Sequence, residues 1–249
     1  MQPQSKTFIS QLLNFVLPPV CVNCHQPLDQ ADQLCAACWR NIDFISAPFC
    51  SATGNPLPYT LSENSLSANA IASPPAYDQA RAIALYTGTM RELIHKLKYQ
   101  DNHELIPLFA KWLTHKGQDL ITKADLIIPI PLHPERLRQR KFNQAGLLAK
   151  RVGQINNRAL AFNALKRKKK TRSQVGLSTS ERKQNVRGAF EVPSNMQPHL
   201  PEKNILLIDD VVTTGATANA ATEVLKQQNA KHIALLSLAI VSNETNPID

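Results

Sequence analysis

Apolar residues in the last two thirds of this 249-residue chain alternate between continuous runs and runs with helical spacing. The continuous runs are as short and as apolar as buried β-strands. They span residues 80–86, 126–130, 205–208 and 233–240. Segments with apolar residues three or four positions apart, which predict amphipathic helices, span residues 90–97, 105–113, 144–155 and 216–228. Strands that alternate with helices predict an α/β fold, with a mostly parallel sheet and helices on both of its faces.

Local signals refine two of these helices. Gly88 breaks the chain after the first strand, and Thr89 and Glu92 have the spacing of a capping box, which would begin the next helix. Three residues of the helix over 144–155 are expected to face the core, namely Leu148, Val152 and Ile155. No internal repeat is apparent in the sequence.

The segment 205–217 predicts a binding site. Asp209 and Asp210 follow the apolar strand, and a turn rich in hydroxyl groups around Gly215 leads into a helix. Free backbone N–H groups and the helix dipole at such a turn attract an anion, whereas two adjacent carboxylates suit sugar hydroxyls or a magnesium ion. The segment therefore predicts a site for a sugar phosphate with vicinal hydroxyls.

Two other interpretations of this segment remain. A plain turn between strand and helix would give the acids no role. A Walker B strand also ends in acids, but it requires a Gly-x-x-x-x-Gly-Lys-Ser/Thr loop elsewhere in the chain. None of the eight glycines forms such a loop.

A second anion site is predicted between the strand at 126–130 and the helix over 144–155. Four cations follow the strand closely, namely Arg136, Arg138, Arg140 and Lys141. A strand end, a group of cations and a helix N-terminus together favour a phosphate, although the same segment taken alone also fits a solvated basic turn. Two such sites predict a ligand that is phosphorylated at both ends.

Two Cys-x-x-Cys pairs near the N-terminus predict a zinc site. Cys21 with Cys24, and Cys35 with Cys38, form two knuckles. Four thiolates at this spacing can close a tetrahedron around a structural zinc ion and leave no open position for catalysis. Disulfides and, at 21–25, covalent attachment of haem are the alternatives, and both belong outside the cytoplasm.

The N-terminal part of the chain has two further features. Cys50 is followed three residues later by Thr53, where a third knuckle would have a cysteine, so we expect a free thiol. Apolar residues on one helical face of 8–16 predict an amphipathic helix that packs on its own protein, with docking on a membrane surface as the alternative. No signal-peptide core is apparent and no run approaches the roughly 20 residues of a membrane span, so we expect a cytoplasmic protein with reduced cysteines.

Charge adds a third basic feature. The formal net charge of +9 and the sequence pI near 9.4 fit an anionic ligand or nucleic acid. Six of the seven residues at 166–172 are cations, so this run should not form a buried element. It fits a solvated loop, a mobile lid over phosphates or a contact to nucleic acid, and a capping box at Ser178 and Glu181 would begin a helix after it.

The predicted organisation is a helix and metal module at 1–55, a linker rich in proline and serine at 56–76, and a main domain at 77–249.

Several of these motifs together resemble one protein family. Residues 205–217 are similar to the phosphoribosyl pyrophosphate (PRPP) signature of type I phosphoribosyltransferases. The Cys-x-x-Cys pairs, a Pro-x-Pro-Leu-His-Pro stretch at 129–134, an Arg-x-Phe-Asn-Gln segment at 140–144 and that signature occur in the same order in the ComF family. The likeness covers nearly the whole chain and includes residues 93–99 and 174–185. One position departs from the family pattern: Lys141 replaces a glycine, whose lack of a side chain lets backbone N–H groups approach pyrophosphate closely.

The resemblance implies a fold and a set of site residues. The fold would be a type I phosphoribosyltransferase, which is Rossmann-like, preceded by a small zinc-ribbon-like module with four cysteine ligands. Asp209 and Asp210 would hold the ribose 2- and 3-hydroxyls, and the loop at 213–217 would wrap the 5-phosphate of PRPP bound with Mg2+. The residues expected to bind PRPP are Lys98, Arg140, Lys141, Asp209, Asp210, Val211, Val212, Thr213, Thr214, Gly215, Ala216 and Thr217. The expected ligands of a structural Zn2+ are Cys21, Cys24, Cys35 and Cys38.

The resemblance also implies a function. We expect a glycosyltransferase that transfers phosphoribosyl from PRPP to an acceptor with release of pyrophosphate, supports DNA uptake in natural transformation, and uses Asp209 and Asp210 in catalysis. The region at 166–185 corresponds to a flexible hood that closes over PRPP. His95 and His133 are the candidate general bases, although a structural or phosphate-side role is favoured for each. The alternative function is a non-catalytic factor of the competence machinery that senses PRPP or binds single-stranded DNA.

Overall fold

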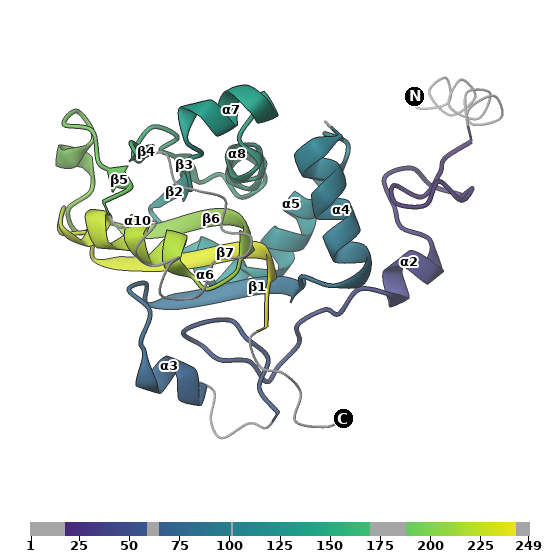
Figure 1. Ribbon diagram of the computed structural model, residues 1–249, viewed down its shortest axis with the longest axis horizontal. Coiled ribbons are helices and arrows are strands. Elements are labelled where there is room, and N and C mark those ends of the chain that lie inside the picture. Colours follow the sequence, from purple (N-terminus) through teal and green to yellow (C-terminus); the bar gives the residue numbers. More distant parts are fainter. Residues whose placement is uncertain (1–17, 59–64, 101, 170–187, 243–249) are drawn as a thin grey trace, which may run out of the picture.

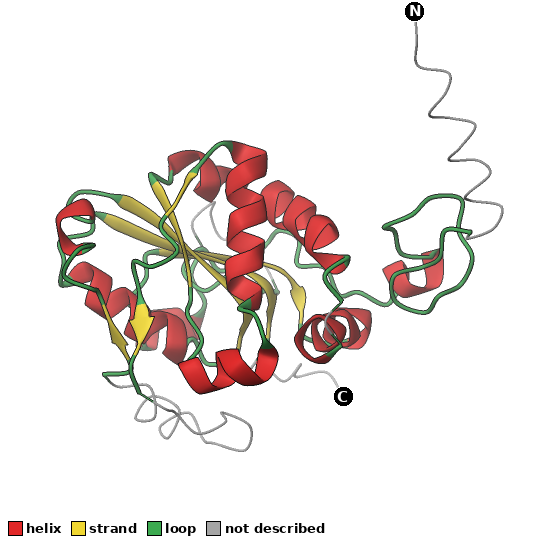
Figure 2. Cartoon of the chain, turned by 90° about the horizontal axis from the view of Figure 1, so that it is seen from above, coloured by secondary structure: helices red, strands yellow, loops and turns green. Residues whose placement is uncertain are grey.

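The computed structural model describes residues 18–58, 65–100, 102–169 and 188–242. Predictions that concern the apolar segment 8–16, the end of the basic run at 170–172 and the segment 174–185 lie outside the described residues. Within the described ranges, no helix is both long enough and apolar enough to cross a membrane. The chain forms the expected α/β fold, in which helices lie on both faces of a central sheet (Figures 1 and 2).

The central sheet is parallel. Within the described residues it has five strands in the order β1-β7-β6-β2-β3. Their bounds are β1 Gln79–Leu85, β2 Leu126–Pro129, β3 Ala159–Leu160, β6 Asn204–Val212 and β7 His232–Ile240. The four predicted strands are therefore confirmed, and their carboxyl ends meet at one edge, where ligands bind in folds of this kind. A separate antiparallel pair joins β4 Lys166–Arg167 to β5 Phe190–Glu191.

Helices cover both faces of the sheet. One face packs against α4 Gly88–Tyr99, α5 Leu105–Lys116, α6 Gln118–Lys123 and α8 Gln144–Asn156, and the other against α10 Ala216–Lys226. Shorter helical segments are α2 Ala36–Arg40, α3 Ala68–Ala72, α7 Pro134–Arg140 and the 3-10 helix η1 Gln197–His199. Because both faces are covered, residues 205–208 of β6 are apolar without interruption: Leu206 and Ile208 enter one core, whereas Leu207 enters the other.

The predicted capping box of α4 was wrong. The helix begins after Thr87, which is its N-cap, so Thr89 and Glu92 lie inside the first turns. The Thr89 hydroxyl instead accepts a hydrogen bond from Asn41 Nδ2 at 3.4 Å. The Glu92 carboxylate accepts one from Asn23 Nδ2 at 2.7 Å. Both side chains therefore bind the N-terminal module to α4.

The buried face of α8 differs from the one predicted from its apolar pattern. Leu148 and Val152 are fully buried, as expected, but Ile155 is 43% exposed. The small residues Ala149 and Gly153 are also buried, because the helix packs closely against β2 and β6. Ile155 lies outside this buried face at the end of the helix, so the expectation that it faces the core was wrong.

The N-terminal module packs against α4 and α5. Trp39 of α2 and Phe44 contact Trp112 of α5, with ring centroids 5.7 and 5.6 Å from the Trp112 ring. The Lys96 ammonium group of α4 donates a hydrogen bond to the backbone carbonyl of Asn23. These contacts place the module beside α4, at the right in Figure 1.

Candidate functional site

The two acids of the predicted site lie where β6 extends past β2. β2 pairs with β6 only as far as Ile208, whereas β7 continues beside β6 to Val212. Among the described residues, no strand pairs with Asp209 and Asp210 on the β2 side. The strand expected to end at Ile208 therefore continues and holds the acids on regular backbone at the carboxyl edge of the sheet.

The turn after β6 has the geometry of a phosphate cradle. Gly215 has a φ of 71° and is the N-cap of α10, whose first backbone N–H groups lack intrahelical partners. A side chain at Gly215 would be strained and would meet the Tyr77 hydroxyl at 3.3 Å. The Thr214 hydroxyl is buried and has no hydrogen-bond partner among the described residues, so a phosphate oxygen would satisfy it. Thr213 and Thr217 line the cavity beside this turn.

The two carboxylates have different surroundings. Lys98 Nζ lies 3.0 Å from Oδ1 of Asp210. Burial, and then the charge of Asp210, raises the pKa of Asp209 to about 7. The backbone N–H of Asp210, which donates to Asp209 Oδ1 at 2.8 Å, and the charges of Lys98 and Arg167 oppose this rise. A cation or hydroxyl donors at Asp209 would favour its ionised form.

A cavity of about 980 Å3 opens at the acids, and cations dominate its walls. The cationic side chains that line it within the described chain are Arg91, Lys98, Arg136, Arg140, Lys141 and Arg167. The acids that line it are Asp209 and Asp210. A concave surface with excess positive charge favours a polyanion.

The structure thus brings most of the predicted residues to one cavity. The predicted residues that line it are Lys98, Arg140, Lys141, Asp209, Asp210, Val211, Thr213 and Thr217. Val212 and Ala216 instead pack into the core below the loop. They support the backbone of the cradle rather than its surface.

The basic segment after β2 contains a helix, α7, which the sequence analysis did not predict. His133 is its N-cap, and His133 Nδ1 accepts the backbone N–H of Glu135 at 3.3 Å. This contact fits the structural role favoured for His133. Lys141 ends the helix with a φ of 63°. Its backbone therefore keeps a conformation that suits the family's glycine, although a side chain is present.

Arg140 forms one wall of the cavity with aromatic rings. Its guanidinium carbon lies 5.4 Å from the centroid of the Tyr99 ring, and Nη2 lies 3.4 Å from the Tyr99 hydroxyl. Nη1 lies 3.5 Å from Oε1 of the fully buried Gln144. The His95 ring lies 4.7 Å from that of Tyr99. The wall therefore combines a cation that was predicted to bind PRPP with a candidate base.

Arg167 is a cavity residue that the sequence did not distinguish from its neighbours. It lies in β4 and is 7% exposed, so the expectation that the basic run forms no buried element was wrong at this position. Its guanidinium lies 5.3 Å from the ring centroid of Phe190 on β5. Burial, and then the charge of Arg136, lowers its pKa, while Asp209 opposes that effect. Among the described cations of the run, Lys166, Lys168 and Lys169 are exposed and Arg167 is buried at its pairing with Phe190.

The four cysteines gather as predicted. Their sulfur atoms lie within 4.8 Å of one another, and those of Cys24 and Cys35 are 3.6 Å apart. Sulfurs about 2.3 Å from a tetrahedral zinc ion would be about 3.8 Å apart, so this spacing fits zinc. The backbone N–H groups of Cys35 and Cys38 donate to the sulfurs of Cys21 and Cys35 at 3.3 and 3.4 Å, which favours thiolates. No disulfide joins the cysteines of the described chain.

Two family models match the chain. The double zinc ribbon domain matches residues 12–70, and the phosphoribosyl transferase domain matches residues 144–249. Competence protein F of Haemophilus influenzae is 29% identical over 225 residues, which cover 88% of this chain and 96% of that protein. DNA utilization protein YhgH of Escherichia coli (strain K12) is 27% identical over 224 residues, which cover 86% of this chain and 93% of that protein. Competence protein ComFC of Streptococcus pneumoniae is 31% identical over 158 residues, which cover 64% of this chain and 66% of that protein.

The parallel sheet, the cradle after β6 and the cluster of four cysteines define the class of protein. It is a type I phosphoribosyltransferase fold preceded by a double zinc ribbon domain, whose cysteine cluster supports a structural zinc ion. The relatives named competence protein F, ComFC and YhgH narrow this class further. The chain belongs to the ComF family.

Proposed function

We propose that this protein binds PRPP with Mg2+ in the cavity at the end of β6. The observation that carries the proposal is the position of Asp209 and Asp210 between a phosphate cradle and a basic wall. The acids would bind the ribose hydroxyls, the loop at 213–217 the 5-phosphate, and the basic wall the pyrophosphate. A ligand with phosphate at both ends and hydroxyls between them matches this order of groups.

We propose further that the site transfers phosphoribosyl to an acceptor. The acceptor nucleophile forms a bond to the anomeric carbon while the bond from that carbon to pyrophosphate breaks, and pyrophosphate leaves with the electron pair. The proton of the nucleophile passes to a base, for which His95 in the cavity wall is the candidate. Ionised Asp209 and Asp210 stabilise the positive charge that develops on the ribose. Arg140 stabilises the leaving group, and bound Mg2+ would neutralise part of the same charge.

The biological setting is also part of the proposal. The names of the relatives, competence protein and DNA utilization protein, support a role in DNA uptake. Thiols that are kept reduced for zinc fit the cytoplasm. We keep as predictions the metal module at 1–55, the linker at 56–76 and the transferase domain at 77–249.

Calorimetric titration with PRPP and Mg2+ tests the binding step. The unmodified protein should bind, and the double variant Asp209→Ala/Asp210→Ala should lose at least about 2.7 kcal/mol, or a factor of about 100 in affinity. Glu223→Ala, which removes an exposed acid from α10, is the control and should bind as the unmodified protein does. Absence of a PRPP signal with the unmodified protein would refute the proposal.

Release of pyrophosphate in the presence of candidate acceptors tests the transfer step. Binding of PRPP without release of pyrophosphate would favour the PRPP-sensing alternative. Binding to single-stranded DNA that weakens with salt, and is lost when the run at 166–172 is neutralised, would favour the DNA-binding alternative.

A further inference from the structure

The segment that follows the zinc module repeats the backbone hydrogen bonds of that module. In the zinc module, the Cys21 N–H donates to the carbonyl of Gln26 at 2.8 Å. In the next segment, the Cys50 N–H donates to the carbonyl of Asn55 at 2.7 Å. In both segments an isolated antiparallel bridge joins the residue before the cysteine to the residue after that carbonyl. Cys50 therefore takes the place of Cys21 in a second ribbon.

The second halves of the two segments correspond as well. In the zinc module, Cys21 Sγ accepts the backbone N–H of Cys35. Cys35 Sγ in turn caps α2 by accepting the backbone N–H of Cys38. In the second ribbon, the Ser67 N–H donates to Cys50 Sγ at 3.3 Å. The Ser67 hydroxyl caps α3 by accepting the Ala70 N–H at 3.2 Å. Each ribbon thus ends in a five-residue helix with the same cap geometry.

These hydrogen bonds fix the correspondence of the ligand positions. They match Cys21 with Cys50, Cys24 with Thr53, Cys35 with Ser67 and Cys38 with Ala70. The expectation that the chain has no internal repeat was therefore wrong. The repeat is hidden in the sequence because the two halves are spaced differently and one cysteine in four is retained.

We infer that the second ribbon folds without zinc, so that the double ribbon binds one zinc ion per chain. Ala70 has no ligand atom, and the neutral hydroxyls of Thr53 and Ser67 are not among the groups that hold structural zinc. Both hydroxyls also have other partners: Ser67 caps α3, and Thr53 accepts from Asn55 Nδ2 at 3.2 Å. The single remaining thiol, on Cys50, is fully buried among these groups.

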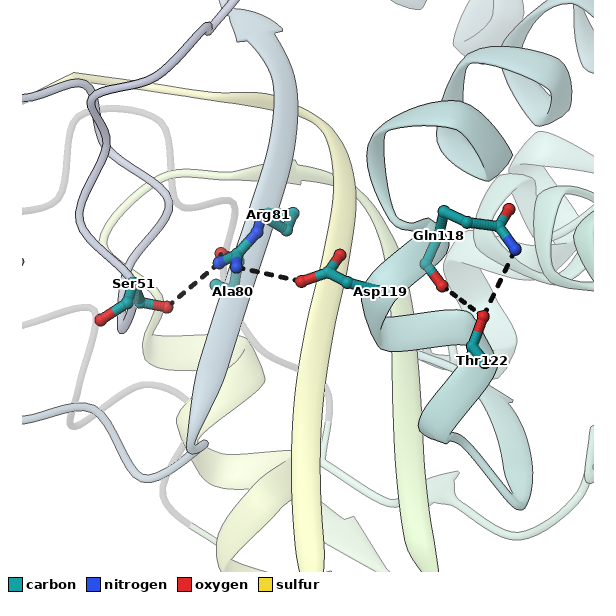
Figure 3. Close-up of polar contacts among 6 residues, drawn as sticks. All are labelled: Ser51, Ala80, Arg81, Gln118, Asp119 and Thr122. Carbon is teal, nitrogen blue, oxygen red and sulfur yellow. Dashed lines mark hydrogen bonds and ion pairs between the residues drawn. The ribbon is translucent and has the colours of Figure 1, made fainter. Parts of the chain in front are cut away.

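Contacts with the central sheet stabilise the second ribbon in place of a metal ion. The Ser51 carbonyl accepts the N–H of Ala80 on the edge strand β1 at 3.2 Å. The same carbonyl accepts a hydrogen bond from Arg81 Nη1 at 3.4 Å (Figure 3). Arg81 Nη2 also pairs with Asp119 of α6 at 3.1 Å, and the Arg81 guanidinium lies 4.7 Å from the Phe49 ring. The second ribbon therefore covers an exposed sheet edge, and this burial and hydrogen bonding stabilise it. The N-terminal module would then extend through α3, beyond the boundary at residue 55 that the sequence predicted.

Elemental analysis of the purified full-length protein tests this inference. We expect one zinc ion per chain, and two would overturn the inference. Cys24→Ser should abolish most of the bound zinc, whereas Cys50→Ser should retain all of it. Loss of zinc from the Cys50→Ser variant would equally overturn the inference.

A gain of metal tests the correspondence of the two ribbons. The triple variant Thr53→Cys/Ser67→Cys/Ala70→Cys places four thiols at the matched positions, and we expect it to bind two zinc ions per chain. A folded triple variant that binds only one would show that the positions do not correspond. If that variant does not fold, the zinc content of the unmodified protein and of Cys50→Ser decides. The result does not depend on PRPP binding, so it can fail while the proposed function stands.

Discussion

Lys98 Nζ lies 3.0 Å from Oδ1 of Asp210, and this ion pair connects α4 with the end of β6. Both side chains are 14% exposed, so solvent screens the pair less than it screens a surface pair. The sequence led us to expect Lys98 to bind PRPP, whereas the structure pairs it with an acid of the same site. One lysine thus compensates one of two adjacent carboxylates, and Asp209 is left as the acid with the raised pKa.

Lys98→Met should therefore change both stability and binding. Removing one partner of a partly buried pair should lower the free energy of unfolding by about 1–3 kcal/mol at neutral pH. Loss of a cation from the cavity should weaken PRPP binding by about tenfold. Thermal denaturation and calorimetry measure the two effects, with Lys150→Met, an exposed lysine of α8, as the control. No change in either quantity would contradict this role of the pair.

Binding of PRPP should increase with pH around neutrality. The pKa of Asp209 is raised to about 7, and the ionised carboxylate accepts hydroxyl donors more strongly and binds Mg2+ better than the protonated acid does. Below the pKa, affinity should fall by about tenfold per pH unit, and above it affinity should be constant. Titrations between about pH 6 and 8 measure the trend, and an affinity that falls as pH rises across this range would exclude Asp209 as the titrating group.

The same shift predicts an effect on the stability of the free protein. The folded pKa of Asp209 lies above its ordinary value of 3.8, so the unfolded state ionises first as pH rises. The folded state loses relative stability between pH values near 4 and 7. Asp209→Asn cannot ionise, so it should be more stable than the unmodified protein at about pH 8, by on the order of 2 kcal/mol. The two proteins should differ less at about pH 5, and equal stability at both pH values would contradict the shift.

Arg167 and Lys168 provide a matched test of the basic run. Arg167 is buried at the cavity, whereas the adjacent Lys168 is exposed and pairs with Glu191. Arg167→Met should weaken PRPP binding by about 10- to 100-fold, because a cation that binds phosphate is lost. Lys168→Met should have little effect, since an exposed ion pair contributes about 1 kcal/mol or less. Equal losses in the two variants would show that only the net charge of the run matters.

Comparing glycine with alanine at position 141 tests the backbone of the basic segment. Lys141 has a φ of 63°, which costs a residue with a side chain about 1 kcal/mol and costs glycine almost nothing. Both Lys141→Gly and Lys141→Ala remove the charge, so a difference between them reports the backbone. We expect the glycine variant to bind PRPP more tightly than the alanine variant, because glycine also allows closer approach of the ligand. Calorimetry of the two variants measures this, and tighter binding by the alanine variant would argue against backbone contacts.

Removal of zinc should unfold the first ribbon and leave the PRPP site intact. The core of this ribbon consists of Cys21, Cys35 and Cys38, with Leu28 and Leu34 packed against them, so the metal supplies much of its stability. A strong chelator should lower the melting temperature, while calorimetry should still detect PRPP binding. A melting curve that the chelator does not change would show that zinc has no structural role here.

Elements that depend on local patterns were predicted from the sequence, whereas elements that depend on contacts between distant residues were not. The run that forms β6 was recognised because burial on both faces requires uninterrupted apolar residues. The capping box of α4 failed because Thr89 and Glu92 have partners in the N-terminal module, about fifty and seventy residues away in the chain. The helix α7 was missed because its sequence is dominated by cations and has no buried residue, so it carries no apolar pattern.

The sequence by itself determined the chemistry of the two centres. The residues of each centre are close together in the sequence, so their local spacing was sufficient to predict them. They are the two acids and the hydroxyl-rich turn with Gly215 in one centre, and the two pairs of thiols in the other. Only the tertiary structure decided that Lys98 lies at Asp210, that Arg167 lines the cavity, and that the segment around Cys50 repeats the hydrogen bonds of the zinc module. These relationships join segments far apart in the chain, and packing of the sheet and its helices is what brings them together.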